Sequence, residues 1–519
     1  NLTGAVELAA RTQLGLESAD AEDLYKVFYS SSTASQHLSN LEPVIVYTEA
    51  LHRAMGYPEV TKATPHYWDD AITYDDLLVQ ARFFRTTTLY PDQVDVPASV
   101  ADYPGDPGTS EPRVSVTVTL DTRDYPHHFM PTGYYAAPGE QVAVFVEGDV
   151  PPDAYLYAHW TTEWTMPRSC QLCPRSTARF PGAAGTLAIV SDGSGVLNAP
   201  MGGPILLMAR ESWGPVTLTL HNVLPQPHFV AGVDNDADFA AELAATTVPF
   251  TMLQEEDVFV LGHTDEIAAA TDSIEEMITT LGDLWRVQQD FSGQSGWSTP
   301  HMFFFDLRVE GGGAHSGNPA YLSHTWELST TNPFWQTSFL GKWGFLHEAG
   351  HSFSNPGTLL YLDKYAYISW REGEPNLLNM VAVDTVFGAG SHQQWSGRSD
   401  AERQATREAF VCNCLASGGC DATDFGTADV VDFGMSIADD PAIGWDGLAA
   451  VYHAFVEPGT DQQAHIDAVA ETLSAQLDRD FGPYMTAYQL PVTPSVLATL
   501  DATYPTDWEA NPLEGLVCP

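Results

Sequence analysis

The chain has 519 residues, 44% of them apolar and 11% aromatic, which is typical of a globular protein rather than a disordered one. Because one hydrophobic core seldom serves so long a chain, we expect about two to four structural units. Its 68 acidic and 21 basic residues give a formal net charge of -47, spread along the chain. This charge excludes nucleic acid as a partner, since its phosphates would be repelled over most of the surface. Acidic side chains of this kind keep a surface hydrated, and a calcium-loaded surface is the alternative.

The first region, residues 1–110, has apolar residues at three- and four-residue spacing, which predicts a helical N-terminal domain. The helices expected there are Ala5–Leu16, Ala21–Tyr29, Pro43–Met55 and Tyr74–Phe84. The turn-forming stretch Tyr103–Gly108 predicts the linker that follows them.

In the second region, residues 113–233, the apolar period changes to two. Val114–Leu120 alternates regularly, and Gln141–Val146 and Val216–Leu220 behave in the same way. Turn-forming clusters separate these runs at short intervals, which predicts a β-sandwich, jelly-roll-like module. We expect this module to brace its neighbour, and sugar binding is the alternative.

In the third region, residues 234–519, the helical period returns and predicts a mainly α-helical domain. The helices expected are Ile267–Gln288, Lys342–Phe353, Glu374–Val386, Trp445–Val456 and Gln462–Leu477, with one apolar strand at Met302–Val309. The sequence as a whole therefore predicts an α+β multidomain fold.

The cysteines number six, an even count that favours disulfides in an oxidising compartment. They are Cys170, Cys173, Cys412, Cys414, Cys420 and Cys518. A structural zinc held by Cys170, Cys173 and two later thiols is the alternative, but the Cys-Asn-Cys spacing at 412–414 matches it poorly. No run of about 18 apolar residues is present, so we expect no membrane span. We infer a secreted or cell-surface protein.

The segment Trp343–His351 contains the pattern His-Glu-x-x-His inside an expected helix. Four-residue spacing places the imidazoles of His347 and His351 on one helical face, where both can bind one Zn²⁺ ion. Zinc with three protein ligands keeps a position for water and lowers its pKa to about 7, so Glu348 can serve as general base. A helix with two unrelated histidines is the alternative. The preceding apolar run and the small Gly350, which permits close packing, weigh against it.

A third ligand is expected downstream of this helix. Glu374 follows His351 after the 22 residues 352–373 and opens a predicted helix. A carboxylate there would complete two nitrogens and one oxygen around zinc, the donor set of hydrolytic sites. Glu372 is the main alternative, and His392 is a weaker one.

These residues resemble the enhancin-like zinc metallopeptidases, the M60 peptidase family of the gluzincin type. In that family a Gly-Glu pair follows the His-Glu-x-x-His helix and supplies the third ligand, and Gly373-Glu374 fits this pattern. The likeness extends to residues 131–140, 202–206, 313–319, 481–484 and 490–492. It covers roughly residues 113–510, about three quarters of the chain.

Several members of this family cleave mucins and other O-glycosylated proteins. The resemblance therefore implies a secreted zinc endopeptidase that cleaves O-glycosylated, mucin-like proteins. We expect a monomer whose partner is an O-glycoprotein or glycopeptide. A zinc peptidase indifferent to glycans, or a glycan-binding adhesin with a vestigial site, are the alternatives. The residues expected near the substrate are His315, Ser316, Gly317, Trp370 and Asn376, and an oxyanion donor is sought among Tyr361, Tyr365 and Tyr367.

Overall fold

The structure is a computed structural model, and its described residues cover most of the chain beyond residue 95. They are 59–67, 96–123, 129–150, 154–158, 176–177, 185–209, 213–294, 300–307, 314–328, 334–338, 341–354, 358–360, 368–418, 424–458, 461–508, 511, 513 and 516–518. Most of the expected helical domain at 1–110 lies outside the described residues. So do Cys170, Cys173 and Cys420, and the three candidate oxyanion donors Tyr361, Tyr365 and Tyr367.

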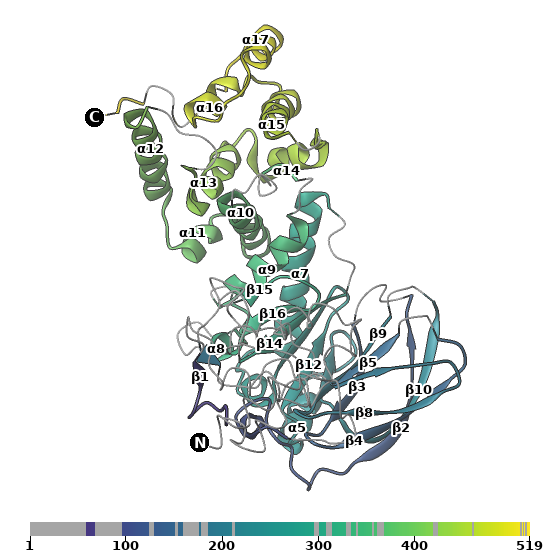
Figure 1. Ribbon diagram of the computed structural model, residues 1–519. Coiled ribbons are helices and arrows are strands. Elements are labelled where there is room, and N and C mark those ends of the chain that lie inside the picture. Colours follow the sequence, from purple (N-terminus) through teal and green to yellow (C-terminus); the bar gives the residue numbers. More distant parts are fainter. Residues whose placement is uncertain are drawn as a thin grey trace, which may run out of the picture. The chain divides into compact units, whose positions relative to one another are not determined.

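Two compact units make up the chain. One contains Asn1–Ile278 and Ser298–Gln336, and the other contains Thr279–Trp297 and Thr337–Pro519. The first holds the sheets, and the second holds a series of helices (Figure 1). The boundary expected at residue 234 does not coincide with these units, and the three-domain division stays a prediction.

Within the first unit, an antiparallel arrangement of eight strands forms the β-sandwich that the period of two predicts. The strands are β2 (Val114–Asp121), β3 (Phe129–Ala136), β4 (Gln141–Glu147), β5 (Tyr155–Ala158), β7 (Gly185–Ala188), β8 (Ser194–Asn198), β9 (Gly203–Met208) and β10 (Pro215–Pro225). Strand β10 belongs to both layers, because its first part pairs with β2 and β4 while its last residues pair with β3. A register shift lies between His221 and Val223, where Asn222 adopts φ 67°. Such a bulge bends the strand from one layer toward the other.

A second, six-stranded sheet follows in the same unit, in the order β11-β12-β13-β14-β16-β15. Its strands are β11 (His228–Val230), β12 (Phe250–Gln254), β13 (Val258–His263), β14 (His301–Asp306), β15 (Ala314–His315) and β16 (Ala320–Ser323), accompanied by the helices α5 (Asp236–Ala245), α6 (Thr264–Ala268) and α8 (His324–Glu327). The region 234–519 is mainly helical, as predicted, but only one strand was expected in it, at Met302–Val309, which corresponds to β14; the other strands of this sheet were missed. Strands β12 and β13 are buried at almost every position, so their sequences lack the alternation that marks a half-buried strand.

The two sheets share a hydrophobic core. Tyr135 and Leu206 of the sandwich belong to the same buried cluster as Phe250 and Phe304 of the six-stranded sheet. At its edge, the Tyr103 hydroxyl donates a buried hydrogen bond to the Phe305 carbonyl oxygen, with 2.9 Å between the oxygens. The sandwich therefore packs on the six-stranded sheet, and its role as a bracing module stays a prediction.

The second unit is helical. Its helices are the larger part of α7 (Ile274–Ser292), then α9 (Trp343–Phe353), α10 (Ile368–Phe387), α11 (Ser391–Ser396), α12 (Asp400–Ala416), α13 (Thr427–Ala438), α14 (Gly444–Ala454), α15 (Gln462–Leu477), α16 (Gly482–Ala487) and α17 (Pro494–Thr503). The predictions for α9, α14 and α15 are confirmed to within two residues, whereas the expected helix 267–288 is divided between α6 and α7. Helix α10 begins at Ile368, six residues before Glu374, and continues through Pro375.

A disulfide joins Cys412 of α12 to Cys518, with 5.2 Å between the Cα atoms. Cys414 is also disulfide-bonded. For these three cysteines the prediction of disulfides is confirmed. Among the helices of the described residues, none has the length and apolar character needed to cross a bilayer.

Candidate metal centre

Helix α9 carries the two histidines of the motif. Its apolar residues Phe345, Leu346 and Phe353 are fully buried, which fixes how the helix is rotated about its axis. The imidazoles of His347 and His351 then lie together, with 3.2 Å between their Nε2 atoms. Two ring nitrogens from residues one helical turn apart therefore lie close enough to bind one ion, as the four-residue spacing predicts.

Helix α10 packs closely on α9 at Gly350. A Cβ atom at Gly350 would lie 2.8 Å from the Cα of Pro375, closer than real side-chain contacts allow. The glycine thus permits the short distance between the helices that brings Glu372 to the histidines. Glu372 Oε2 lies 3.1 Å from His347 Nε2 and 3.5 Å from His351 Nε2.

These three separations fit one zinc ion. Tetrahedral zinc with ligand bonds of about 2.0 Å has neighbouring donor atoms roughly 3.3 Å apart. The observed separations of 3.1, 3.2 and 3.5 Å lie close to that value. The donor set of two imidazoles and one carboxylate is also that of catalytic zinc sites, which leave one position open.

The structure differs from the expectation at the third donor, because it gathers Glu372 and not Glu374 with the histidines. Residues two apart in a helix point about 200° apart around its axis, so the two carboxylates leave α10 in different directions. The Glu374 carboxylate is buried and accepts hydrogen bonds from the Ser354 and Thr358 hydroxyls and from the Leu360 N–H. It holds the segment that follows α9, and burial raises its pKa.

His392, the weaker alternative, is also engaged elsewhere. It lies in α11, where its Nδ1 is 2.6 Å from Asp384 Oδ2. The Trp445 indole N–H donates to the same carboxylate oxygen. His392 is not in the group that gathers at α9.

Two neighbours orient His347. Its Nδ1 is 3.2 Å from Asn376 Oδ1, and the Asn376 amide nitrogen donates to the Glu372 carbonyl oxygen. The amide oxygen therefore accepts from Nδ1–H, which leaves the Nε2 lone pair for a metal. The Trp343 indole stacks on the His347 ring, with centroids 4.8 Å apart, and is 44% exposed. Asn376 thus orients His347, whereas it was expected near the substrate.

Burial and the close charges shift the pKa values of the three groups that gather at the site. Burial opposes ionisation of Glu372, but hydrogen bonds from His347 and His351 outweigh it and hold its pKa below the usual value. Burial also opposes protonation of both histidines. The Glu372 hydrogen bond overcomes this at His347, whose pKa is raised, but not at His351, whose pKa is lowered.

Glu348 is the remaining carboxylate of the motif. Burial raises its pKa to about 7, although the charge of His347 acts in the opposite direction. Among the described residues, none donates a hydrogen bond to its carboxylate. A carboxylate with this pKa and no fixed partner is suited to take up and release a proton near neutral pH.

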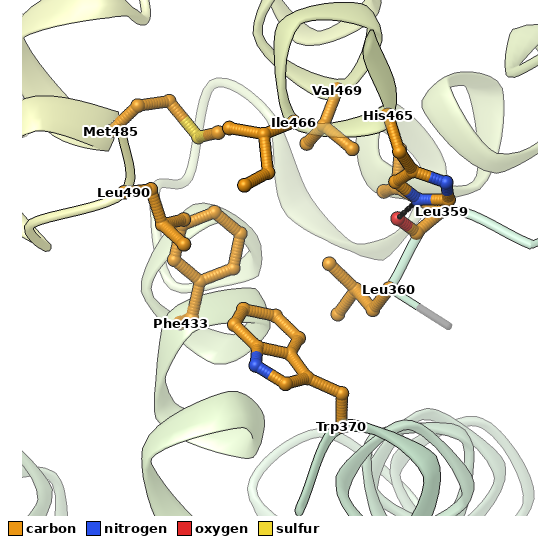
Figure 2. Close-up of a pocket in the computed structure, with 9 residues that line it drawn as sticks. All are labelled: Leu359, Leu360, Trp370, Phe433, His465, Ile466, Val469, Met485 and Leu490. Atoms are coloured by element: carbon orange, nitrogen blue, oxygen red, sulfur yellow. Dashed lines mark hydrogen bonds between the residues drawn. The ribbon is translucent and has the colours of Figure 1, made fainter. Parts of the chain in front are cut away.

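The other residues expected at the substrate are dispersed. Trp370 is 1% exposed and lines a small apolar cavity of about 10 Å³ with Leu360 and Phe433 (Figure 2). It is a core residue of the second unit. His315, Ser316 and Gly317 lie at β15, the edge strand of the sheet in the first unit, and their substrate role stays a prediction.

A second group of metal-binding residue types was not expected from the sequence. His263, His324 and Glu327 lie together in the first unit. His324 and Glu327 are three residues apart in α8, and this spacing is the one feature of the sequence that could have indicated a metal site here. His263 ends β13 and is distant in sequence, so the pair alone did not indicate a site.

A comparison with protein families gives one match. The family described as peptidase M60, enhancin and enhancin-like matches residues 222–489, just over half of the chain. A TRPM8 channel-associated factor homolog from Danio rerio is 22% identical over 443 residues, which cover 80% of this chain. The chain spans 44% of the length of that relative.

Solved structures resemble the fold at low sequence identity. IMPa metallopeptidase from Pseudomonas aeruginosa in complex with T-antigen gives a TM-score of 0.59 at 15% identity, over 94% of this chain and 63% of the other. The M60 catalytic domain of ZmpC from Clostridium perfringens, in complex with sialyl T antigen, gives 0.52 at 12% identity, over 76% and 80% of the two chains.

Proposed function

Because the chain belongs to the peptidase M60, enhancin and enhancin-like family, we propose that it is a zinc-dependent endopeptidase. The observation that carries the proposal is the convergence of three donor atoms, from His347, His351 and Glu372, at separations of 3.1 to 3.5 Å. Glu348 lies in the same helix with an available carboxylate. Glu372, and not Glu374, is the third ligand in this proposal.

A bound zinc ion supplies Lewis acidity, which polarises a substrate carbonyl and lowers the pKa of a coordinated water. The protein's own residues do the rest. Asn376 and Trp343 keep the His347 ring in place, and Gly350 keeps Glu372 within reach. These supports fix the donor positions before substrate binds, which lowers the cost of organising the site.

Glu348 is the general base of the proposed reaction. Its carboxylate takes a proton from the water that attacks the peptide carbonyl carbon. It then delivers that proton to the amine nitrogen as the C–N bond breaks. Burial supports this role, because a carboxylate with a pKa of about 7 releases its proton readily at neutral pH.

For the substrate, we propose an O-glycosylated protein. Among the structures with a similar fold, IMPa has been captured with T-antigen and with an O-glycopeptide. In this chain the exposed face of Trp343 beside His347 offers an aromatic surface on which a sugar ring can stack. The disulfides support a secreted or cell-surface location.

The experiment is a digest of a mucin-like glycoprotein, analysed by mass spectrometry beside the Glu348→Gln variant. We expect cleavage by the wild-type protein and a rate at least about 10²-fold lower for the variant, the usual effect of removing a general base. Equal cleavage by both proteins would overturn the mechanism. A matched peptide with and without GalNAc on Ser or Thr tests the substrate class, and equal rates would favour a peptidase indifferent to glycans.

A further inference from the structure

A fully buried carboxylate, that of Glu327, holds two histidines side by side in the first unit. Its Oε2 lies 2.6 Å from His263 Nδ1 and 2.8 Å from His324 Nδ1. Its Oε1 accepts hydrogen bonds from the His263 backbone N–H and from the Trp335 indole N–H, each 3.0 Å long. All four interactions direct hydrogen atoms toward the carboxylate, so each imidazole carries its proton on Nδ1.

The Nε2 atoms of both rings are consequently lone-pair donors. The two rings lie side by side, with centroids 3.9 Å apart. His263 Nε2 is buried and has no hydrogen-bond partner. A buried acceptor without a partner costs free energy, and a bound ion or water is a common explanation for one in a native protein.

Both rings line a cavity of about 400 Å³. Its other lining residues include the acidic side chains of Asp102, Asp106, Asp265 and Glu266. Among the described residues that line it, none is a lysine or arginine. The lining of the cavity thus combines two histidines with four acidic residues and no countering positive charge, which suits a cation and disfavours an anion.

We propose that this cavity is a second divalent-cation site, in which the Nε2 atoms of His263 and His324 bind a borderline ion such as Zn²⁺. Glu327 stands behind the ligands, since histidines that bind metals almost always donate their other ring N–H to a carboxylate, carbonyl or water. The contacts of 2.6 and 2.8 Å are hydrogen-bond lengths, shorter than the roughly 3.3 Å that separates two ligands of one zinc ion. Glu327 is therefore an orienting residue and not a ligand. Water and the cavity carboxylates complete the coordination.

The proposal does not rest on peptidase activity, because every residue of the cavity lies in the first unit and His347, His351 and Glu372 lie in the second. Its test is the number of ions bound per chain. The protein of 519 residues is stripped with a chelator and then titrated with Zn²⁺, and the metal that stays bound after dialysis is measured by elemental mass spectrometry. Circular dichroism accompanies each titration to show that the protein is folded.

Two double variants separate the sites. The wild type should bind about two ions per chain, and the His347→Ala, His351→Ala protein should keep one, because its second cavity is intact. The His263→Gln, His324→Gln protein should also lose one ion. His221→Gln is the matched control, since this half-buried imidazole of β10 contacts Ser115 and lies outside both groups, and it should bind as many ions as the wild type.

Two results would overturn the proposal. If the folded His347→Ala, His351→Ala protein binds no ion, the cavity is not a cation site, whether or not the other variant folds. If the His263→Gln, His324→Gln protein is folded and binds as many ions as the wild type, the ion lies elsewhere. By contrast, failure of the proposed peptidase function alone would give two results together: the wild type is inactive, and the His347→Ala, His351→Ala protein still binds one ion.

The orienting role of Glu327 has its own readout. In the background of His347→Ala, His351→Ala, Glu327→Gln should weaken Zn²⁺ binding by about 10- to 100-fold, as loss of such carboxylates does elsewhere. The exchange keeps the size of the side chain and changes its charge. An unchanged Kd would contradict the orientation of the imidazoles by Glu327.

Discussion

Gly350→Ala tests whether the close approach of α9 and α10 builds the metal centre. The added Cβ would lie 2.8 Å from the Pro375 Cα and 2.9 Å from its carbonyl oxygen, which are backbone atoms that cannot rotate away. Real Cβ atoms essentially never lie closer than 3.0 Å to such an atom and ordinary contacts begin at 3.4 Å, so the helices must separate by a few tenths of an ångström. Overpacking of this size lowers the free energy of unfolding by about 1–3 kcal/mol.

The same movement draws Glu372 away from His347 and His351. Since a misplacement of about 1 Å can reduce catalysis by 10²-fold, we expect a loss of that order in kcat/KM and a weaker Zn²⁺ complex. Zinc affinity is measured by competition with a chelating dye, kcat/KM on a glycopeptide, and stability by thermal unfolding.

Gly434→Ala is the matched control for this experiment. Its Cβ would lie 2.4 Å from a methyl group of Leu377, far along a flexible side chain and away from the metal ligands. It should lower stability with little effect on zinc affinity. If Gly350→Ala binds zinc and cleaves as the wild type does, the helix spacing does not set the site and the reasoning is refuted.

Three other predictions follow from the contacts and charges. Glu372→Gln should reduce zinc affinity and activity. Glu374→Gln should bind zinc as the wild type does, but it should lower the free energy of unfolding by about 1–3 kcal/mol, because it disturbs buried hydrogen bonds. The reverse pattern would show that Glu374 is the ligand. Burial raises the pKa of Asp432 from its usual value of 3.8 to about 6. As pH falls, the folded state therefore binds this proton before the unfolded state does. The stability that results is gained as pH falls and lost as pH rises through 6. Urea unfolding at pH 7 and pH 5 should show the wild type gaining about 1 kcal/mol relative to Asp432→Asn, and equal changes would contradict it. Because the chain carries a net charge of -47, sialylated glycopeptides should be cleaved more slowly than desialylated ones at low salt, with the difference shrinking as salt rises; equal rates at low salt would remove this prediction.

The sequence predicts best what is local to one helix. The spacing of His347 and His351 settles their relative position as soon as α9 forms, and the structure places their Nε2 atoms 3.2 Å apart. The period of two in β2, β4 and β10 likewise predicts the sandwich, because one face of each strand is more buried than the other.

The third donor depends on which face of α10 meets α9, and no local pattern records that contact. Glu374 was expected because it opens a predicted helix and because Gly373-Glu374 fits the pattern of the family that the chain resembles. In the structure Glu374 lies inside α10, and it is Glu372 that lies with the two histidines of α9. Since residues two apart in a helix point about 200° apart, the two carboxylates take different roles.

The six-stranded sheet and the His263 group escape prediction for a different reason. Strands β12 and β13 are buried on both faces, and a short apolar run without alternation does not separate strand from helix. His263 and His324 meet because β13 and α8 are brought together by the fold, and no local pattern records that contact.

The most direct test of the metal centre is a crystal structure of the zinc-loaded protein with anomalous diffraction collected at the zinc edge. We predict an anomalous peak about 2.0–2.2 Å from His347 Nε2, His351 Nε2 and a Glu372 carboxylate oxygen, with one coordination position open to solvent. No such peak between these residues, or a peak whose fourth position is filled by another protein side chain, would contradict the account.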